Sequence, residues 1–256
     1  ITTVNKSIFT SCKKTDNCPP WSIQANEITH DQNKKQINYK NALLKIYDVP
    51  ILYFPKFFHP DPTVTRQSGI LIPTLNNSNI LGSSFNLPYY HVISNDSDIT
   101  VTPSFFNSGT TMIQSEYRNV KENSDFIIDF GFVNNFESSI EKNKNSIFNL
   151  FSEYNLNLGL ENFSTSQLFL KIQKVTNDSF LKIFDTNLNN ENTSLKPDDF
   201  NTLKSELKIS LVNENYNFES GIISYENLQK TNNDRYEYIL PYYYYSTNLS
   251  DIFFGG

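Results

Sequence analysis

The chain has 256 residues, a formal net charge of −6 and a hydrophobic fraction of 38%. Two alanines, Ala25 and Ala42, are too few for a helical bundle, whereas 21 Phe and 15 Tyr favour β-strands. Mild acidity without a basic cluster argues against a nucleic-acid partner, and an aromatic fraction of 14% argues against disorder.

The first predicted region, residues 1–62, contains both cysteines and the only tryptophan. Strands are predicted at residues 21–25 and 36–46, the second continuing to Pro55, with a turn at 30–33. Short strands joined in this way are typical of a jelly roll.

The segment 63–79 is expected to be a connector, and residues 80–256 form a series of alternating segments. The alternation is strongest at 147–160, where apolar and polar residues take turns. A period of two predicts a strand with one apolar and one polar face. About nine such segments are expected, together with a short helix start at 200–204.

Two features bear on whether this region spans a membrane. No apolar run approaches the roughly 18 residues that a membrane helix needs, but many alternating segments have the length of a tilted membrane strand. Charges such as Glu116, Arg118 and Glu153 lie in mid-strand. Such charges could face a water-filled lumen. The strands of a soluble β-sandwich, however, also alternate apolar and polar residues. Alternation alone leaves both possibilities open.

A proline-rich crossing follows the first region. His59 and Asp61 superficially resemble a catalytic or metal-binding pair, but Pro60 and Pro62 fix the backbone beside them. We therefore interpret these four residues as a rigid interdomain hinge. No serine–histidine–aspartate set, carboxylate pair or phosphate-binding loop stands out, so we expect no enzyme activity, metal or cofactor.

The two cysteines, Cys12 and Cys18, leave several interpretations open. They could be buried thiols or half of a zinc site, but no second pair of ligands is present. A local disulfide is the favoured interpretation if the chain is secreted. The chain starts at Ile1 without methionine, so we read it as a piece of a longer protein, and a missing targeting signal excludes no location.

Several ordered motifs carry a resemblance to a known family. They comprise Asn41–Ile46, Val49–Pro55, His59–Thr63, Arg66, Ser68–Pro73, Leu87–Tyr90, Asp98–Pro103, Glu116–Arg118 and Asp234–Pro241. In this order they resemble the LptD (OstA or Imp) family of lipopolysaccharide-assembly outer-membrane proteins. The resemblance is most specific at 50–73, and between about 137 and 230 it rests on pattern alone.

The resemblance implies an all-β fold. The chain would hold the C-terminal part of a periplasmic jelly roll, followed by the first antiparallel strands of a large outer-membrane β-barrel. Lipopolysaccharide would arrive from an LptA-like periplasmic bridge protein and pass through the jelly roll. It would leave laterally at the first barrel strand into the outer membrane lipid, while an LptE-like lipoprotein plugs the barrel.

The resemblance also gives roles to particular residues. Pro88 and Pro103 match family prolines beside the lateral gate, although from the residues alone each would be read as a β-bulge. Some family members pair jelly-roll cysteines with barrel cysteines, which leaves the partners of Cys12 and Cys18 open. The expected lipid groove of the jelly roll comprises Trp21, Ile23, Leu44, Ile46, Ile51 and Tyr53.

Two other functions remain as alternatives. A passive porin-like channel would need a closed set of strands, which about nine cannot provide. A soluble carbohydrate-binding β-sandwich could use the tyrosines at 242–245 as a sugar platform.

Overall fold

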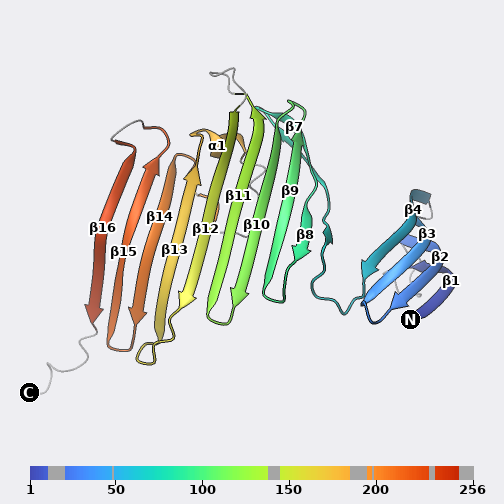
Figure 1. Ribbon diagram of the computed structural model, residues 1–256, viewed down its shortest axis with the longest axis horizontal. Helices are drawn as coiled ribbons and strands as arrows, with labels where there is room; N and C mark the ends of the chain where they lie inside the picture. Colours follow the sequence, from blue (N-terminus) through green and yellow to red (C-terminus); the bar gives the residue numbers. More distant parts are fainter. Residues whose placement is uncertain are drawn as a thin grey trace, which may run out of the picture. The chain divides into compact units, whose positions relative to one another are not determined.

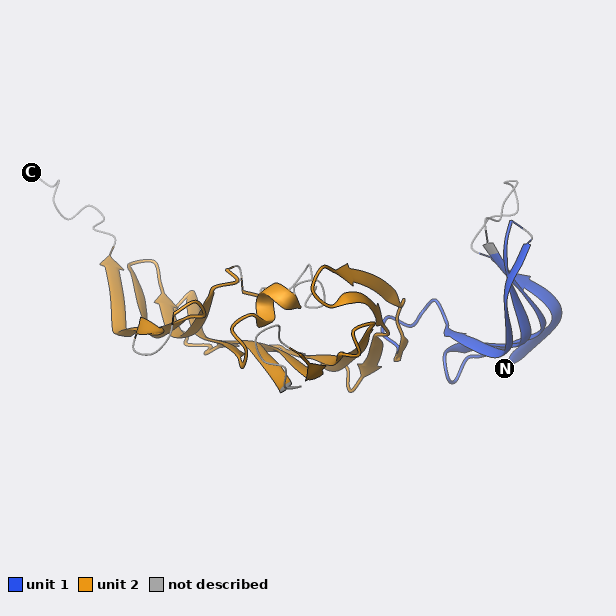
Figure 2. Cartoon of the chain, turned by 90° about the horizontal axis from the view of Figure 1, so that it is seen from above, with its two compact units in different colours: residues 1–67 blue, residues 68–256 orange. Residues whose placement is uncertain are grey.

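The computed structural model describes residues 1–10, 21–47, 49–137, 145–184, 195–197, 199–230 and 234–247. Strands dominate these residues, and the chain divides into two units, Ile1–Gln67 and Ser68–Gly256 (Figures 1 and 2). The predicted all-β, antiparallel fold is confirmed. No helix in the described ranges has the length and apolar character needed to cross a membrane.

Unit 1 is a four-stranded antiparallel sheet in chain order. Its strands are β1 (Thr2–Phe9), β2 (Trp21–Asp31), β3 (Gln36–Ile46) and β4 (Val49–Pro60). β2, β3 and β4 occupy the segments predicted as strands. The sequence did not predict β1, because this edge strand is mostly exposed and lacks a continuous apolar face.

The core of unit 1 explains the position of the two alanines. Ala25 and Ala42 lie directly opposite each other on β2 and β3, and their exposed fractions are only 2% and 0%. Tyr39 is 1% exposed and belongs to the same cluster. Asn41 has a φ of 49°, and the pairing of β3 with both neighbours skips this residue. The strand therefore bends here, beside a position filled by a methyl group.

Unit 2 contains a 12-stranded antiparallel sheet. The strands are β5 (Gly69–Ile70), β6 (Thr74–Ser78), β7 (Gly82–Asn86), β8 (Tyr89–Val92), β9 (Ser97–Phe106), β10 (Thr111–Lys121), β11 (Ser124–Phe136), β12 (Asn145–Asn157), β13 (Thr165–Val175), β14 (Thr202–Val212), β15 (Tyr216–Asn227) and β16 (Tyr236–Thr247). From β9 to β16 each strand pairs with the next (Figure 1).

The start of unit 2 differs from the expected connector. Residues 63–79 include β5 and β6, which pair with β8 and β7 respectively. The expected helix start at 200–204 is also wrong, because β14 begins at Thr202. The helix within the described part of the chain is α1 (Phe180–Ile183), in the connection between β13 and β14.

One face of this sheet, here called the apolar face, exposes large hydrophobic side chains. Cross-strand pairs such as Ile113–Phe132, Phe132–Phe148 and Leu207–Ile222 place them on the same side. Their exposed fractions range from 39% to 48%. The opposite face, here called the polar face, carries the mid-strand charges. This division is what strict alternation predicts.

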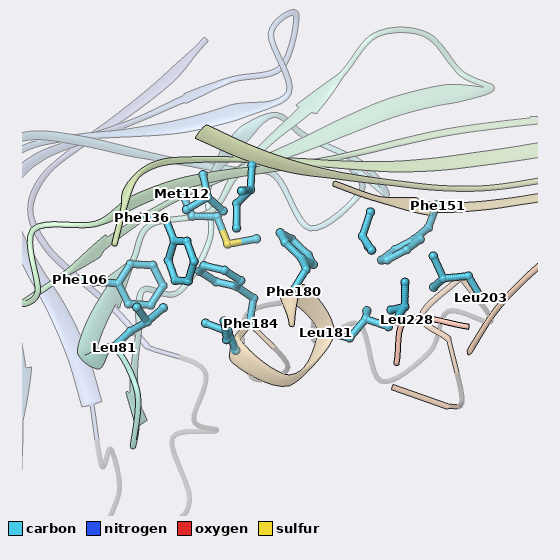
Figure 3. Packing of buried hydrophobic residues seen from close by; sticks show 14 of the residues in the cluster. Leu81, Phe106, Met112, Phe136, Phe151, Phe180, Leu181, Phe184, Leu203 and Leu228 are labelled. Carbon is cyan, nitrogen blue, oxygen red and sulfur yellow. The ribbon is translucent and has the colours of Figure 1, made fainter. Parts of the chain in front are cut away.

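A hydrophobic cap covers one end of the polar face. Phe180 and Phe184 are fully buried and pack in one cluster with Met112, Val133 and Phe151 (Figure 3). Figure 2 shows α1 over one side of the sheet. The cap lies at the end where the strands are joined by the longer connections, since the opposite end has short turns such as that between β10 and β11.

Candidate functional site

The two prolines predicted from the sequence, Pro88 and Pro103, lie where the hydrogen-bond ladder of the sheet is interrupted. β7 and β8 both pair with β9, and Leu87 between them lies opposite Pro103 in the shared register. The Leu87 N–H donates to the Pro103 carbonyl at 3.1 Å. A hydrogen-bonded pair of an antiparallel ladder normally exchanges two such bonds, but Pro103 has no N–H with which to return the second.

β7 and β8 together form one segment with β9 on one edge, and Pro88 affects the hydrogen bonds of its other edge. Its carbonyl accepts a 2.9 Å hydrogen bond from the Leu71 N–H, so this residue faces the β5–β6 side. Its missing N–H removes a ladder bond there. The two prolines therefore remove bonds from both edges of the segment formed by β7 and β8, which we call the proline seam.

The six expected groove residues do not all share a face of unit 1. Ile23 lies opposite Leu44, so Ile23, Leu44 and Ile46 belong to one side of the sheet, and the backbone of Trp21 pairs with that of Ile46. Tyr53 lies opposite Leu43 instead, and its hydroxyl donates to the Asn41 side chain at 2.8 Å.

Further residues belong to the side of the sheet that carries Ile23 and Leu44. Ile51, 52% exposed, lies at the register shift between β3 and β4. Leu52 and Phe54 lie opposite Leu44 and Ala42. Sequence reasoning missed both residues. The register between β3 and β4 shifts between Leu44 and Lys45, so a period of two gives the wrong parity for the β4 residues near Ile51.

The expected hinge residues are tied to unit 1. His59 Nδ1 is 2.6 Å from the Pro60 carbonyl, which only accepts, so Nδ1 carries the proton. In the neutral ring Nε2 then accepts the Tyr39 hydroxyl proton at 2.7 Å. Burial raises the pKa of Tyr39 to about 12, which keeps this donor protonated.

Asp61 is held by two kinds of contact. Its carboxylate accepts the Thr63 N–H at 2.8 Å and contacts the His30 ring. The Thr63 hydrogen bond, with a smaller contribution from His30, lowers the Asp61 pKa below its usual 3.8. The Asp61 N–H also donates to the Lys35 carbonyl at 2.9 Å. Pro62, next to it, is exposed. These contacts anchor the crossing to the β2–β3 turn.

The polar face carries four ion pairs, three of which join neighbouring strands, whereas Lys204 and Glu206 both lie on β14. They are Arg118–Asp98 at 2.9 Å, Lys171–Glu153 at 2.8 Å, Lys204–Glu206 at 2.7 Å and Lys208–Glu219 at 3.7 Å. Asp98 and Glu153 are only 6% and 7% exposed. A buried carboxylate needs such a partner to remain charged, so this face is arranged for a polar environment.

A tight amide cluster lies among these charges. Gln114 and Asn149 flank Gly131 in register, and both side-chain amides donate to Asp129. Their oxygens both lie over the glycine, 2.3 and 2.1 Å from where a Cβ would be. With any larger residue here both amides would have to move, a constraint that the sequence pattern does not reveal.

The remaining sequence expectations concern the two cysteines and the absence of a metal site. Cys12 and Cys18 lie outside the described residues. Within the described ranges, no group of three or more His, Cys, Asp or Glu side chains could hold a metal ion.

Comparison with known proteins shows what this chain is similar to. No protein-family model matches the chain. The LPS-assembly protein LptD of Pseudoalteromonas translucida (strain TAC 125) is 28% identical over 179 residues, which are 70% of this chain and 23% of that protein. LptD of Idiomarina loihiensis is 26% identical over 178 residues, 70% of this chain and 22% of that protein. The chain is therefore similar to LPS-assembly proteins over about 70% of its own length.

A shorter region is more similar to other LptD proteins. The LptD of Yersinia pseudotuberculosis serotype I is 35% identical over 117 residues, 46% of this chain and 15% of that protein. Each of these matches covers less than a quarter of the LptD relative. The resemblance inferred from the motifs is confirmed. The all-β structure is consistent with the jelly-roll and barrel strands expected of an LptD protein.

Proposed function

We propose that this chain is part of an outer-membrane protein that transports lipopolysaccharide and inserts it into the outer leaflet. The supporting observation is the two-faced sheet of unit 2 in a chain similar to LPS-assembly proteins. An exposed apolar face suits membrane hydrocarbon, and an ion-paired opposite face suits a wet lumen. The role is transport rather than catalysis.

The proposed lipid path uses both units. In the periplasm, acyl chains occupy the side of unit 1 that carries Ile23, Leu44 and Ile46. The hinge at 59–62 then leads to the barrel. The lipid leaves laterally beside the proline seam, where each proline has removed a ladder bond. An LptA-like bridge supplies the lipid, and an LptE-like lipoprotein fills the lumen.

The two alternative functions fit the structure less well. A carbohydrate-binding sandwich would cover its apolar face with a second sheet, but residues such as Ile113 and Ile222 are 48% and 41% exposed. A passive channel would not need a lateral opening, so it does not account for two prolines that remove hydrogen bonds from the same segment.

The seam can be tested by restoring the missing donors. In the full-length protein, the double variant Pro88→Ala/Pro103→Ala should strengthen the seam and reduce lipopolysaccharide delivery to the cell surface. Pro241→Ala is the matched control, because Pro241 is also a strand proline but lies in β16, away from the seam. Surface lipopolysaccharide would be measured in cells that depend on the variant. Wild-type delivery by the double variant would refute the gate role.

A further inference from the structure

The apolar face contains a groove that the proposed lipid path does not use. It has a volume of about 330 Å³ and crosses β13 to β16. Its apolar walls are formed by Leu170, Ile172, Leu207, Ile222, Tyr238 and Leu240. Sites that hold small ligands have volumes of about 300–1,000 Å³, so the groove is large enough for part of a lipid molecule.

Local interruptions in the sheet create this groove. Ser205 and Ser224 line it and lie directly opposite each other on β14 and β15, where the neighbouring apolar-face pair is Leu207–Ile222. The small serines make the floor lower than its surroundings. On β15, the pairing with β16 also shifts register between Gly221 and Ile223.

The hydroxyl of Ser205, one of the two serines in the floor, is occupied by backbone hydrogen bonds. The Ser205 hydroxyl accepts the Gln173 N–H at 3.1 Å and lies 3.5 Å from the Gln173 carbonyl, to which it donates. It thereby takes over hydrogen bonds that the backbone ladder between β13 and β14 would otherwise make. A hydroxyl engaged with β13 in this way can lie beside hydrocarbon without an unpaired polar group.

One end of the groove has a charged rim. Two residues beyond Ile172, Ser224 and Tyr238, on the same face of each strand, are Lys174, Glu226 and Tyr236. The Lys174 Nζ donates to Glu226 at 2.7 Å and to the Tyr236 hydroxyl at 3.2 Å. The rim therefore forms one connected network.

Arg235 extends this network toward the β13–β14 connection. Its guanidinium donates to Glu226 at 2.7 Å and to Asp178 at 2.7 Å. Glu226 is 5% exposed and shared by two cations, whereas the Lys174 side chain is 46% exposed. The Asp178 side chain is 48% exposed but lies farther from the groove, in the β13–β14 connection, so Lys174 is the accessible charge of this network nearest the groove.

We propose that this groove binds one acyl chain of a lipopolysaccharide molecule in the outer leaflet, with a phosphate of the same molecule at Lys174. The proposal rests on the proposed function, which places the apolar face in the membrane. The rim lies at the end with the long connections, and long connections face the cell exterior in outer-membrane barrels. The exposed Lys174 ammonium beside the apolar groove can donate hydrogen bonds to the phosphate of an anionic lipid.

The site can be tested by photo-crosslinking in cells that express the full-length protein. A benzophenone amino acid would replace Tyr238, which is 59% exposed on the groove wall, or Phe132, which is 40% exposed on the same face outside the groove. Lipopolysaccharide adducts should be about fivefold more abundant at position 238. Equal yields, or adducts with glycerophospholipid alone at position 238, would overturn the proposal.

Second-site variants separate a specific site from general lipid contact. Ser224→Leu would fill the floor, and Lys174→Gln would remove the accessible charge; each should lower the adduct at position 238 about fivefold. Ser115→Leu is the matched control, since Ser115 pairs with Phe130 on the apolar face away from the groove. An unchanged adduct in both groove variants would refute the site.

Surface delivery of lipopolysaccharide, measured in the same cells, distinguishes this proposal from the proposed function. Normal delivery without an adduct at position 238 contradicts only the groove. An adduct that persists when the proline double variant delivers lipopolysaccharide normally contradicts only the lateral gate.

Discussion

At the scale of single residues, small side chains determine where larger polar groups can meet. Gly131 lets the Gln114 and Asn149 amides lie over its Cα, so both can donate to Asp129. Ser205 carries ladder hydrogen bonds through its side chain. In both cases the neighbours on adjacent strands define the role of the residue, because cross-strand pairs are the units of packing in a sheet.

A methyl group at position 131 should therefore be costly. In Gly131→Ala, the new Cβ would meet both amide oxygens at under 2.5 Å, so the amides must move and Asp129 loses donors. We expect a loss of about 1–3 kcal/mol in the free energy of unfolding, the usual range for overpacking. Urea unfolding followed by circular dichroism would measure it. Gly69→Ala is the control, because nothing lies within 4 Å of its Cβ position; equal losses in the two variants would contradict the argument.

At the scale of elements, the β13–β14 connection acts as a hydrophobic cap. The four residues of α1 are too few to form a stable isolated helix. They are held by Phe180 and Phe184, which are fully buried against the sheet (Figure 3). The helix therefore exists because Phe180 and the neighbouring Phe184 pack in one cluster with residues of β9 to β12, rather than because of a strong local helix signal.

Removing one of these aromatic side chains should loosen the cap. Phe184→Ala deletes a ring that is 0% exposed and contacts Phe106, Phe136 and Phe180. Such truncations usually cost about 3–5 kcal/mol. Hydrogen exchange of the 176–184 amides should rise strongly. In Phe132→Ala, where the ring is 40% exposed on the opposite face, these amides should keep their protection; the same increase in both variants would argue against a specific cap.

At the scale of the whole molecule, the chain is built from two units with separate cores. The cluster around Ala25, Tyr39 and Ala42 belongs to unit 1, and the cluster around Phe180 and Phe184 belongs to unit 2. Among the residues that the structure describes, neither cluster includes a residue of the other unit. Each unit should therefore respond to core substitutions by itself.

An enlarged side chain at position 42 tests this independence. Ala42→Leu adds three carbons at a site that is 0% exposed, so unit 1 should lose about 1–3 kcal/mol of stability. Hydrogen exchange should accelerate in β2–β4 and stay unchanged in β10–β13. Lys56→Leu, at an exposed position of β4, should leave both units unchanged. Faster exchange in β10–β13 of the Ala42→Leu variant would show that the units are coupled.

The sequence by itself determined the fold class and most strands, because alternation and aromatic content are local properties. Its ordered motifs pointed to the LptD family, and they picked out Pro88 and Pro103 because a missing N–H is intrinsic to proline. The tertiary structure decided what depends on pairing. It set Leu87 opposite Pro103, separated Tyr53 from Ile23, made strands of β1, β5 and β6, and put the helix at Phe180–Ile183. Bulges change side-chain parity, and edge strands gain stability from their neighbours, so neither can be read from a period of two.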